Sequence, residues 1–265
     1  MKIQGRNCTL TVARDGDYYP LPYSEETVRE ASKGYVLPGV IGRRNREKTV
    51  ITHKEIEGCF TTRLDVNVVQ CLFLLFFYYE NTFDLYADRV FEKIIYKNAK
   101  CRGFELRGEN GEALKLRVDV KSSKDSYVTE WPVNIPNLTW KVIAGSSPAM
   151  TYTFDGHLVI ADFVKLPLVY RFELNASFDE KNSYQIKLYF PLSTEQYPIK
   201  NSIEKLSLVL DTADGVNLDL YNLIPSDELC RINCADTVLC NQTFRIEGPV
   251  VFNLRNEKQN MQLIL

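Results

Sequence analysis

Residues 168–190, LVYRFELNASFDEKNSYQIKLYF, contain two runs in which apolar and polar side chains alternate. The first run sets Leu168, Tyr170, Phe172 and Leu174 against Val169, Arg171 and Glu173. The second sets Tyr184, Ile186, Leu188 and Phe190 against Gln185, Lys187 and Tyr189. Because successive side chains of a strand point to opposite faces, this period of two predicts half-buried antiparallel strands.

The same signals recur on both sides of this stretch. Cys8, Leu10 and Val12 alternate with two threonines near the start of the chain. Four dipeptides suit type I′ hairpin turns, in which both central residues take a positive φ: Asp15-Gly16, Asn110-Gly111, Asp155-Gly156 and Asp214-Gly215. Apolar runs flank the second and fourth dipeptides, at 104–106 and 114–120 and at 206–210 and 218–223. The sequence therefore predicts a mainly β protein built from antiparallel β-sandwiches or barrels.

Two segments depart from this pattern. Ser24-Glu25-Glu26-Thr27 has the capping residue and acidic first turn of a short helix, which Gly34 would end. Asp65–Tyr79 has the length of a buried helix, with apolar residues at helical spacing. Its β-branched and aromatic residues leave a strand as the alternative for this second segment.

A partial internal repeat in the sequence suggests two domains. Leu106, Gly111, Leu114, Leu116 and Val120 match residues 104 positions later, and Ile56-Glu57-Gly58 matches Ile246-Glu247-Gly248. The two repeated motifs occur in opposite order along the chain. Both a gene duplication and two unrelated hairpins would therefore explain them. The polar stretch Lys121–Asp125, followed by two prolines, is a natural linker. We predict β domains at 1–125 and 126–265, each with a short flanking helix or long loop.

Composition and charge exclude several classes of protein. The 265 residues include 32 Lys and Arg and 34 Asp and Glu, for a net charge of −2. Binding nucleic acid requires a surplus of basic residues, so the composition argues against a nucleic-acid-binding protein. The start is polar and the most apolar run, Val66–Tyr79, is too short for a membrane helix, so we expect no membrane segment. Seven irregularly spaced cysteines predict reduced thiols rather than a disulfide framework.

No motif for catalysis, nucleotides or metals occurs. His53 and His157 lie in predicted loop and turn contexts, and Cys230, Cys234 and Cys240 lack the fourth ligand that structural zinc needs. We expect no enzyme activity, no cofactor and no metal.

Residues 34–55 are the most unusual segment. Glycines and a proline argue against a regular strand, and a long irregular stretch inside a compact domain is usually functional. Its basic residues are suited to charged pairing across an interface. We predict a long loop that acts as an arm docking on a neighbouring subunit, with a solvated loop as the alternative and a nucleic-acid clamp as the weaker one. The candidate contact residues are Tyr35, Arg43, Arg44, Arg46 and Lys48.

The order of these elements resembles the tail tube proteins of long-tailed bacteriophages. In that family an early strand pair and a long loop lead into an "E-G-S-L-T"-like strand and a short helix. Glu57–Leu64 followed by Asp65–Tyr79 looks like that arrangement, with Cys59 in the place of a small serine. The hairpin at 100–120 follows, and a second tube-like domain would place Ile203–Leu223 as its central hairpin and Asp236–Leu254 as a closing strand pair.

The resemblance implies a structural virion protein, assembled in the host cytoplasm, whose copies form stacked rings of a hollow tail tube. Two tube-like domains per chain would allow trimers as well as hexamers, and the arm would bridge rings. The implied partners are other copies, other phage tail proteins, and DNA only as it passes through the lumen.

Two other functions remain open. A distal tail or adaptor protein shares the same fold. A monomeric carbohydrate-binding β-sandwich would use exposed aromatic platforms, for which Trp131 and Trp140 are the candidates.

Overall fold

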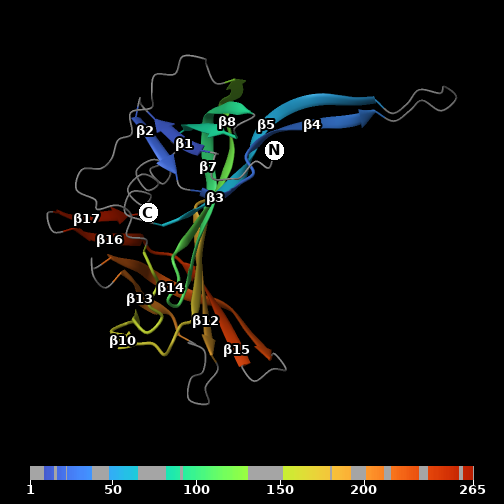
Figure 1. Cartoon of the computed structure of the whole chain (residues 1–265). Coiled ribbons are helices and arrows are strands. Elements are labelled where there is room, and N and C mark those ends of the chain that lie inside the picture. The colour runs from blue at the N-terminus through green and yellow to red at the C-terminus, as the bar shows by residue number, and fades with distance from the viewer. Residues whose placement is uncertain are drawn as a thin grey trace.

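The part of the chain that the computed structural model describes is almost entirely β (Figure 1). The structure describes residues 9–14, 17–21, 23–37, 48–64, 82–89, 92–130, 152–179, 181–191, 201–211, 216–232, 238–256 and 259–264. The described part contains no helix, and all its strand pairs are antiparallel. The prediction of a mainly β fold is confirmed.

The strands follow one another along the chain with few long connections. They are β1 Thr9–Arg14, β2 Asp17–Leu21, β3 Tyr23–Glu26, β4 Arg29–Leu37, β5 Lys48–Arg63, β6 Phe83–Asp88, β7 Lys93–Glu109, β8 Lys115–Glu130, β9 Val159–Ala161, β10 Val164–Lys165, β11 Arg171–Ser177, β12 Ser183–Pro191, β13 Ile203–Asp211, β14 Val216–Ile232, β15 Val238–Ile246, β16 Val250–Asn256 and β17 Gln259–Ile264.

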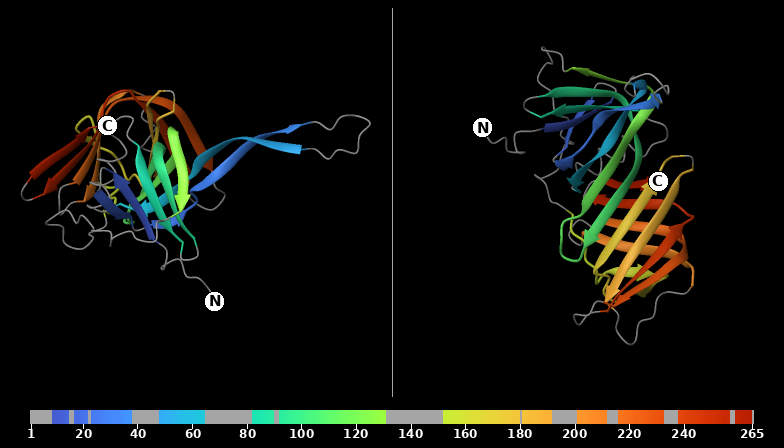
Figure 2. Two further views of the ribbon diagram at one scale, coloured as in Figure 1. Left: turned by 90° about the horizontal axis from the view of Figure 1, so that it is seen from above. Right: turned by 90° about the vertical axis from the view of Figure 1, so that its right-hand side faces the viewer.

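Two lobes are visible, joined by the long strands β7 and β8 (Figure 2). β7 pairs with β8 along one edge, and on its other edge it changes partner from β6 to β11. The change occurs beside an irregularity between Cys101 and Gly103, where the ladder with β8 shifts register. A bulge bends a strand and increases its twist, so one strand can serve two differently oriented groups of strands.

β14 has a similar role in the second lobe. Its first half pairs with β13 and β16, and its second half pairs with β15 from Leu223 onward, with a register shift between Pro225 and Asp227. The predicted hairpins at 104–120 and 206–223 are therefore confirmed as β7–β8 and β13–β14. The predicted closing strand pair is wrong, because β15 and β16 both pair with β14 and not with each other.

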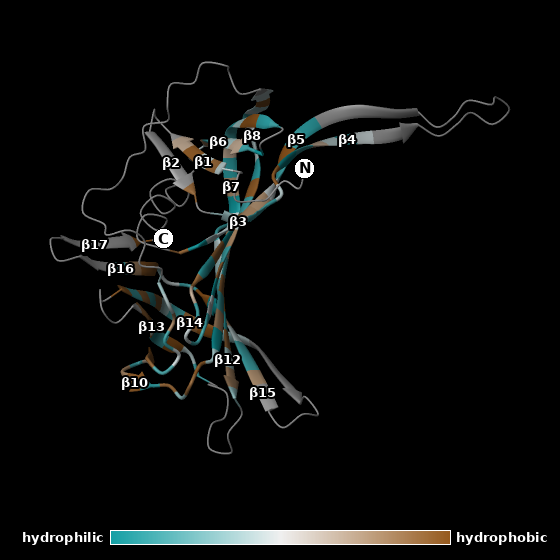
Figure 3. Ribbon diagram, in the orientation of Figure 1, coloured by the Kyte–Doolittle hydropathy of each residue, from teal (hydrophilic) through white to brown (hydrophobic). Residues whose placement is uncertain are grey.

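One continuous core fills both lobes, and alternation explains most of it. Banding of polar and apolar residues is visible along β7 and β8 (Figure 3). Phe172 and Leu174 are fully buried in β11, as are Ile186 and Leu188 in β12. The alternation fails just before β11, where Val169 is buried although the pattern places it on the polar face.

The predicted boundary between domains falls within regular structure. Lys121–Asp125 belongs to β8 and is not a linker, and β7 hydrogen-bonds with β11 on the other side of the boundary. The division into 1–125 and 126–265 stays a prediction. The predicted helix from Ser24 to Gly34 is wrong, because these residues form β3 and most of β4. The predicted helix Asp65–Tyr79 lies outside the described residues.

The turn chemistry differs from the prediction. At Asn110-Gly111 only the glycine has a positive φ, of 78°, and the Glu112 N–H donates to the Glu109 carbonyl over 2.9 Å. A positive φ at the second central residue alone is typical of a type II turn. Neither residue of Asp155-Gly156 has a positive φ. The other two dipeptides lie outside the described residues.

A true two-residue turn with both φ values positive joins β9 to β10. It is Asp162-Phe163, with φ of 45° and 70°, and Phe163 is 98% exposed. The Asp162 side chain accepts a hydrogen bond from the Lys205 N–H over 2.8 Å, which ties the turn to β13. A side chain with a Cβ is uncommon at this φ, which explains why a sequence search for Gly-containing pairs missed it.

Cys101 is buried in the hydrophobic core. Burial raises the pKa of its thiol to about 12, from an ordinary value of 9.0. The folded thiol therefore keeps a proton that the unfolded chain loses near pH 9, so its contribution to stability falls as the pH rises from about 9 toward 12.

We expect Cys101 to resist alkylation in the folded protein, because the thiolate is the reactive species. Iodoacetamide at pH 8 should leave the Cys101 peptide unmodified in the native state and modify it fully in guanidinium, as read by peptide mass spectrometry. Native labelling of Cys101 at the rate of a free thiol would contradict the burial described above.

Candidate assembly arm

A two-stranded hairpin projects from the first lobe, and we call residues 29–37 and 48–57 the arm (Figure 1 and Figure 2). The register runs from Arg29 opposite Glu57 to Leu37 opposite Lys48, with one shift beside Gly34. Beyond Glu57, β5 continues into the lobe between β3 and β8. At the root of the arm, Glu57 also lies opposite Lys121 of β8, and the Ile56 N–H donates to Ser122 Oγ over 2.5 Å. The other described residues of the arm have strand partners only within the arm.

The inner part of the arm is held by ion pairs across its two strands. Arg29 contacts Glu57 at 3.0 Å, Lys54 contacts Glu30 at 2.8 Å, and Lys33 contacts Glu55. All three basic side chains are more than half exposed. Exposed pairs of this kind contribute about 0.2–1 kcal/mol each, so they set the register more than they stabilise the hairpin.

The arm contains some of the predicted contact residues. Tyr35 lies in β4 opposite Val50, and Lys48 begins β5 opposite Leu37. Arg43, Arg44 and Arg46 lie outside the described residues. The prediction of a loop without regular structure over 34–55 is wrong for its two ends, because 34–37 and 48–55 are strands. His53, predicted to be a loop residue, lies in β5 opposite Lys33.

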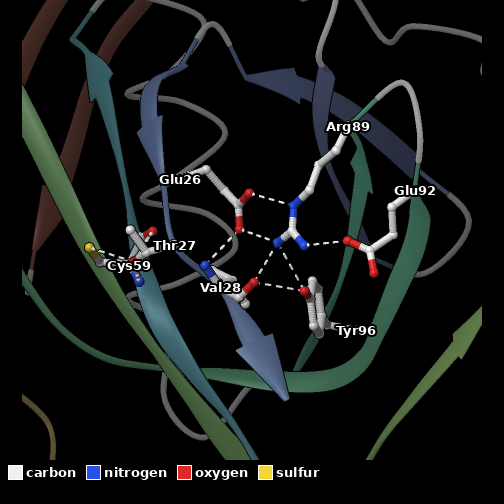
Figure 4. Close-up of polar contacts among 7 residues, drawn as sticks. All are labelled: Glu26, Thr27, Val28, Cys59, Arg89, Glu92 and Tyr96. Carbon is white, nitrogen blue, oxygen red and sulfur yellow. Dashed lines mark hydrogen bonds and ion pairs between the residues drawn. The ribbon is translucent and has the colours of Figure 1, made fainter. Parts of the chain in front are cut away.

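A polar network anchors the root of the arm to the body (Figure 4). Arg89 follows β6 and donates to both carboxylate oxygens of Glu26, from Nε over 3.0 Å and from Nη2 over 2.8 Å. Glu26 ends β3, and its side chain is only 6% exposed. The same carboxylate accepts the Val28 N–H over 2.6 Å. A two-pronged Arg–carboxylate contact fixes orientation as well as charge, so it holds the chain where β3 gives way to β4.

Tyr96 and Glu92 complete this network. The Tyr96 hydroxyl donates to the Val28 carbonyl over 2.7 Å and lies 3.0 Å from Arg89 Nη2, while Arg89 Nη1 reaches Glu92 Oε2 at 3.0 Å. The hydrogen bond and charge of Glu26 raise the pKa of Arg89. Burial raises the pKa of Tyr96. Both groups therefore keep their protons at any physiological pH.

Gly58 lets two strands approach closely at the same root. Its φ is +138°, and a Cβ there would lie 2.5 Å from the Thr27 carbonyl oxygen and 2.6 Å from the Val28 Cα. Thr27 and Cys59 bond reciprocally beside it, with Thr27 N–H donating to the Cys59 carbonyl over 2.9 Å and Cys59 N–H to Thr27 Oγ1 over 3.1 Å. This contact lies at the point where β5 leaves the body sheet and enters the arm.

We expect Gly58→Ala to destabilise the protein more than Gly111→Ala. Both glycines have a positive φ, but nothing lies within 4 Å of a Cβ at Gly111. Gly111→Ala should cost only the backbone strain, about 1–2 kcal/mol. Gly58→Ala must also move the backbone at Thr27 and Val28. Urea unfolding of both variants measures the difference, and equal losses would contradict the close approach.

Sequence reasoning missed the anchoring residues. Glu26 and Arg89 are 63 positions apart and have no local pattern that connects them. Gly58 had a usable signal, since a lone glycine inside a strand pattern marks a bulge or a close backbone approach.

The other sequence candidates are dispersed or fall outside the described residues. His157 is exposed in a turn, where its N–H donates to Asp155 Oδ1 over 2.9 Å. Within the described residues, no group of three metal-ligating side chains occurs. The β14–β15 register places Cys230 opposite Cys240, and Cys234, Trp131 and Trp140 lie outside the described residues. None of the described residues forms a helix with the length and hydropathy that a membrane span requires.

Comparison with models of known protein families gave no match for this chain, and comparison with curated protein sequences gave no match either.

Proposed function

We propose that this chain is a structural subunit that self-assembles into rings stacked as a phage tail tube, with the arm as the contact between copies. The observation that carries the proposal is the arm itself. Among the described strands, β4 and residues 48–56 of β5 opposite it have no third strand beside them, and an isolated two-stranded hairpin is marginal in water. Docking on a second subunit would cover the open edges of the arm and stabilise it.

Two further features support the proposal. The body is a mainly β scaffold of antiparallel strands, which suits the tube domains that the sequence resembles. Contacts of Glu26, Arg89 and Gly58 hold the chain where the arm begins, and the arm points away from its own lobe (Figure 1 and Figure 2). A paired hairpin loses less conformational freedom on docking than an irregular loop would.

Size-exclusion chromatography with light scattering tests the proposal. We expect a mass that grows with concentration from the 30.6 kDa chain to multiples of three or six. Rings that never stack would favour the adaptor role over the tube. A constant 30.6 kDa species that binds glycans would overturn self-assembly and favour the carbohydrate-binding module.

A further inference from the structure

We propose that the arm of one copy adds as an extra strand to the open edge of β17 in a second copy, in a head-to-tail arrangement. This inference rests on the proposed self-assembly and names the surface that receives the arm. An unpaired strand edge presents a row of N–H and C=O groups that can bond to another chain.

Most open edges in the described part of the molecule carry features that discourage such pairing. Proline and charged residues protect an edge, and so does a very short strand. β2 contains Asp17 and Pro20, and β3 contains Glu25 and Glu26. The outer half of β14 carries Pro225, Asp227 and Glu228, the outer end of β8 carries Lys124, Asp125 and Glu130, and β10 has two residues.

β17 has none of these protective features. Its six residues, QNMQLI, include no charge and no proline, and among the described strands it pairs only with β16. Ile264 near its end is 63% exposed. A six-residue strand spans roughly 20 Å, long enough for a full ladder with an incoming strand. An uncharged open edge of this length is an aggregation hazard unless a partner covers it.

The outer arm matches β17 in character. Gly34–Leu37 and Lys48–Ile51 are rich in β-branched and apolar residues, with Lys48 as their only charge. Val, Ile, Tyr and Thr favour a paired strand. Hydrogen bonds to β17 would add a third strand to the arm and so remove its marginal stability.

The two surfaces lie on opposite sides of the molecule. The arm points away from one side, and β16 and β17 lie at the other, in views taken at right angles (Figure 1 and Figure 2). Pairing within one chain is therefore excluded. Contact between two different surfaces repeats from copy to copy and generates a ring or an open filament.

Photo-cross-linking tests the pairing directly. A benzophenone amino acid replaces Tyr35, and the variant is mixed with isotopically labelled wild-type protein so that cross-links between copies are distinguished by mass. We expect the main cross-linked peptide to contain residues 259–264. If the arm is needed for assembly but the cross-links fall elsewhere, this inference fails and the proposed function stands. If the wild type remains monomeric, both fail.

A matched pair of charge variants gives a second test. Lys48 is the only charged residue of the described outer arm, Gly34–Leu37 and Lys48–Ile51. Gln262→Lys should raise the concentration needed for half-assembly by roughly three- to fivefold, and Gln262→Glu should leave it unchanged or lower it. The difference should shrink at high salt. Equal behaviour of the two variants, both folded by circular dichroism, would overturn the docking of the arm on β17.

Discussion

A variant in which residues 35–52 are replaced by a short Gly-Ser linker is expected to fold normally and to remain monomeric at concentrations where the wild type assembles. The described residues removed pair with one another, apart from Ile51, which lies opposite Gly34 within the arm, so the body loses no partner strand. Closing the shortened loop changes the conformational entropy little. Sedimentation velocity reports the loss of assembly, and circular dichroism with thermal unfolding reports the retained fold.

Phe163→Ser is the matched control for this variant. Phe163 is 98% exposed at the tip of the β9–β10 hairpin, so its change alters another projecting hairpin while the arm stays intact. We expect unchanged assembly. If Phe163→Ser blocks assembly and the arm deletion does not, the contact surface is the β9–β10 tip and the role assigned to the arm is wrong. An arm-deleted protein that unfolds would show that the arm belongs to the core.

Arg89→Met is expected to be among the most destabilising single changes in the first lobe. Its removal leaves the carboxylate of Glu26, which is 6% exposed, without its cationic partner. Breaking a buried pair in this way costs about 3–5 kcal/mol. Urea denaturation measures the loss in the free energy of unfolding.

The exposed pair Arg29–Glu57 supplies the control for Arg89→Met. Both pairs anchor the start of the arm, but the Arg29 side chain is 70% exposed. Arg29→Met should therefore cost less than about 1 kcal/mol. The double variant Arg89→Met with Glu26→Gln should recover part of the loss, because it removes the uncompensated charge. Equal losses for Arg89→Met and Arg29→Met would show that the root network does not hold the arm.

The strands that sequence analysis predicted best are those with one buried and one solvated face. β11 and β12 follow this rule, because alternation is a local property that burial on one face imposes. β4 could not be recognised in this way. Apart from the partly buried Ala31, its residues from Arg29 to Gly34 are exposed, so alternation has little cause there. Ser24-Glu25-Glu26 also imitates the start of a helix.

The sequence singled out the segment 34–55 but did not predict its strands. The excess of Arg and Lys over 34–55 drew attention to the segment, and the hairpin was missed because glycine and proline argued against strands. The ladder tolerates Gly34 through a shift in register beside it. The network of Glu26, Arg89 and Tyr96 depends on pairing between distant strands, which a single sequence does not encode locally.

Negative-stain electron microscopy of the purified wild-type protein, over a series of concentrations, tests self-assembly most directly. We expect hollow rings at moderate concentration and stacked tubes at high concentration. Uniform single particles of about the size expected for one 30.6 kDa chain, at every concentration, would contradict it.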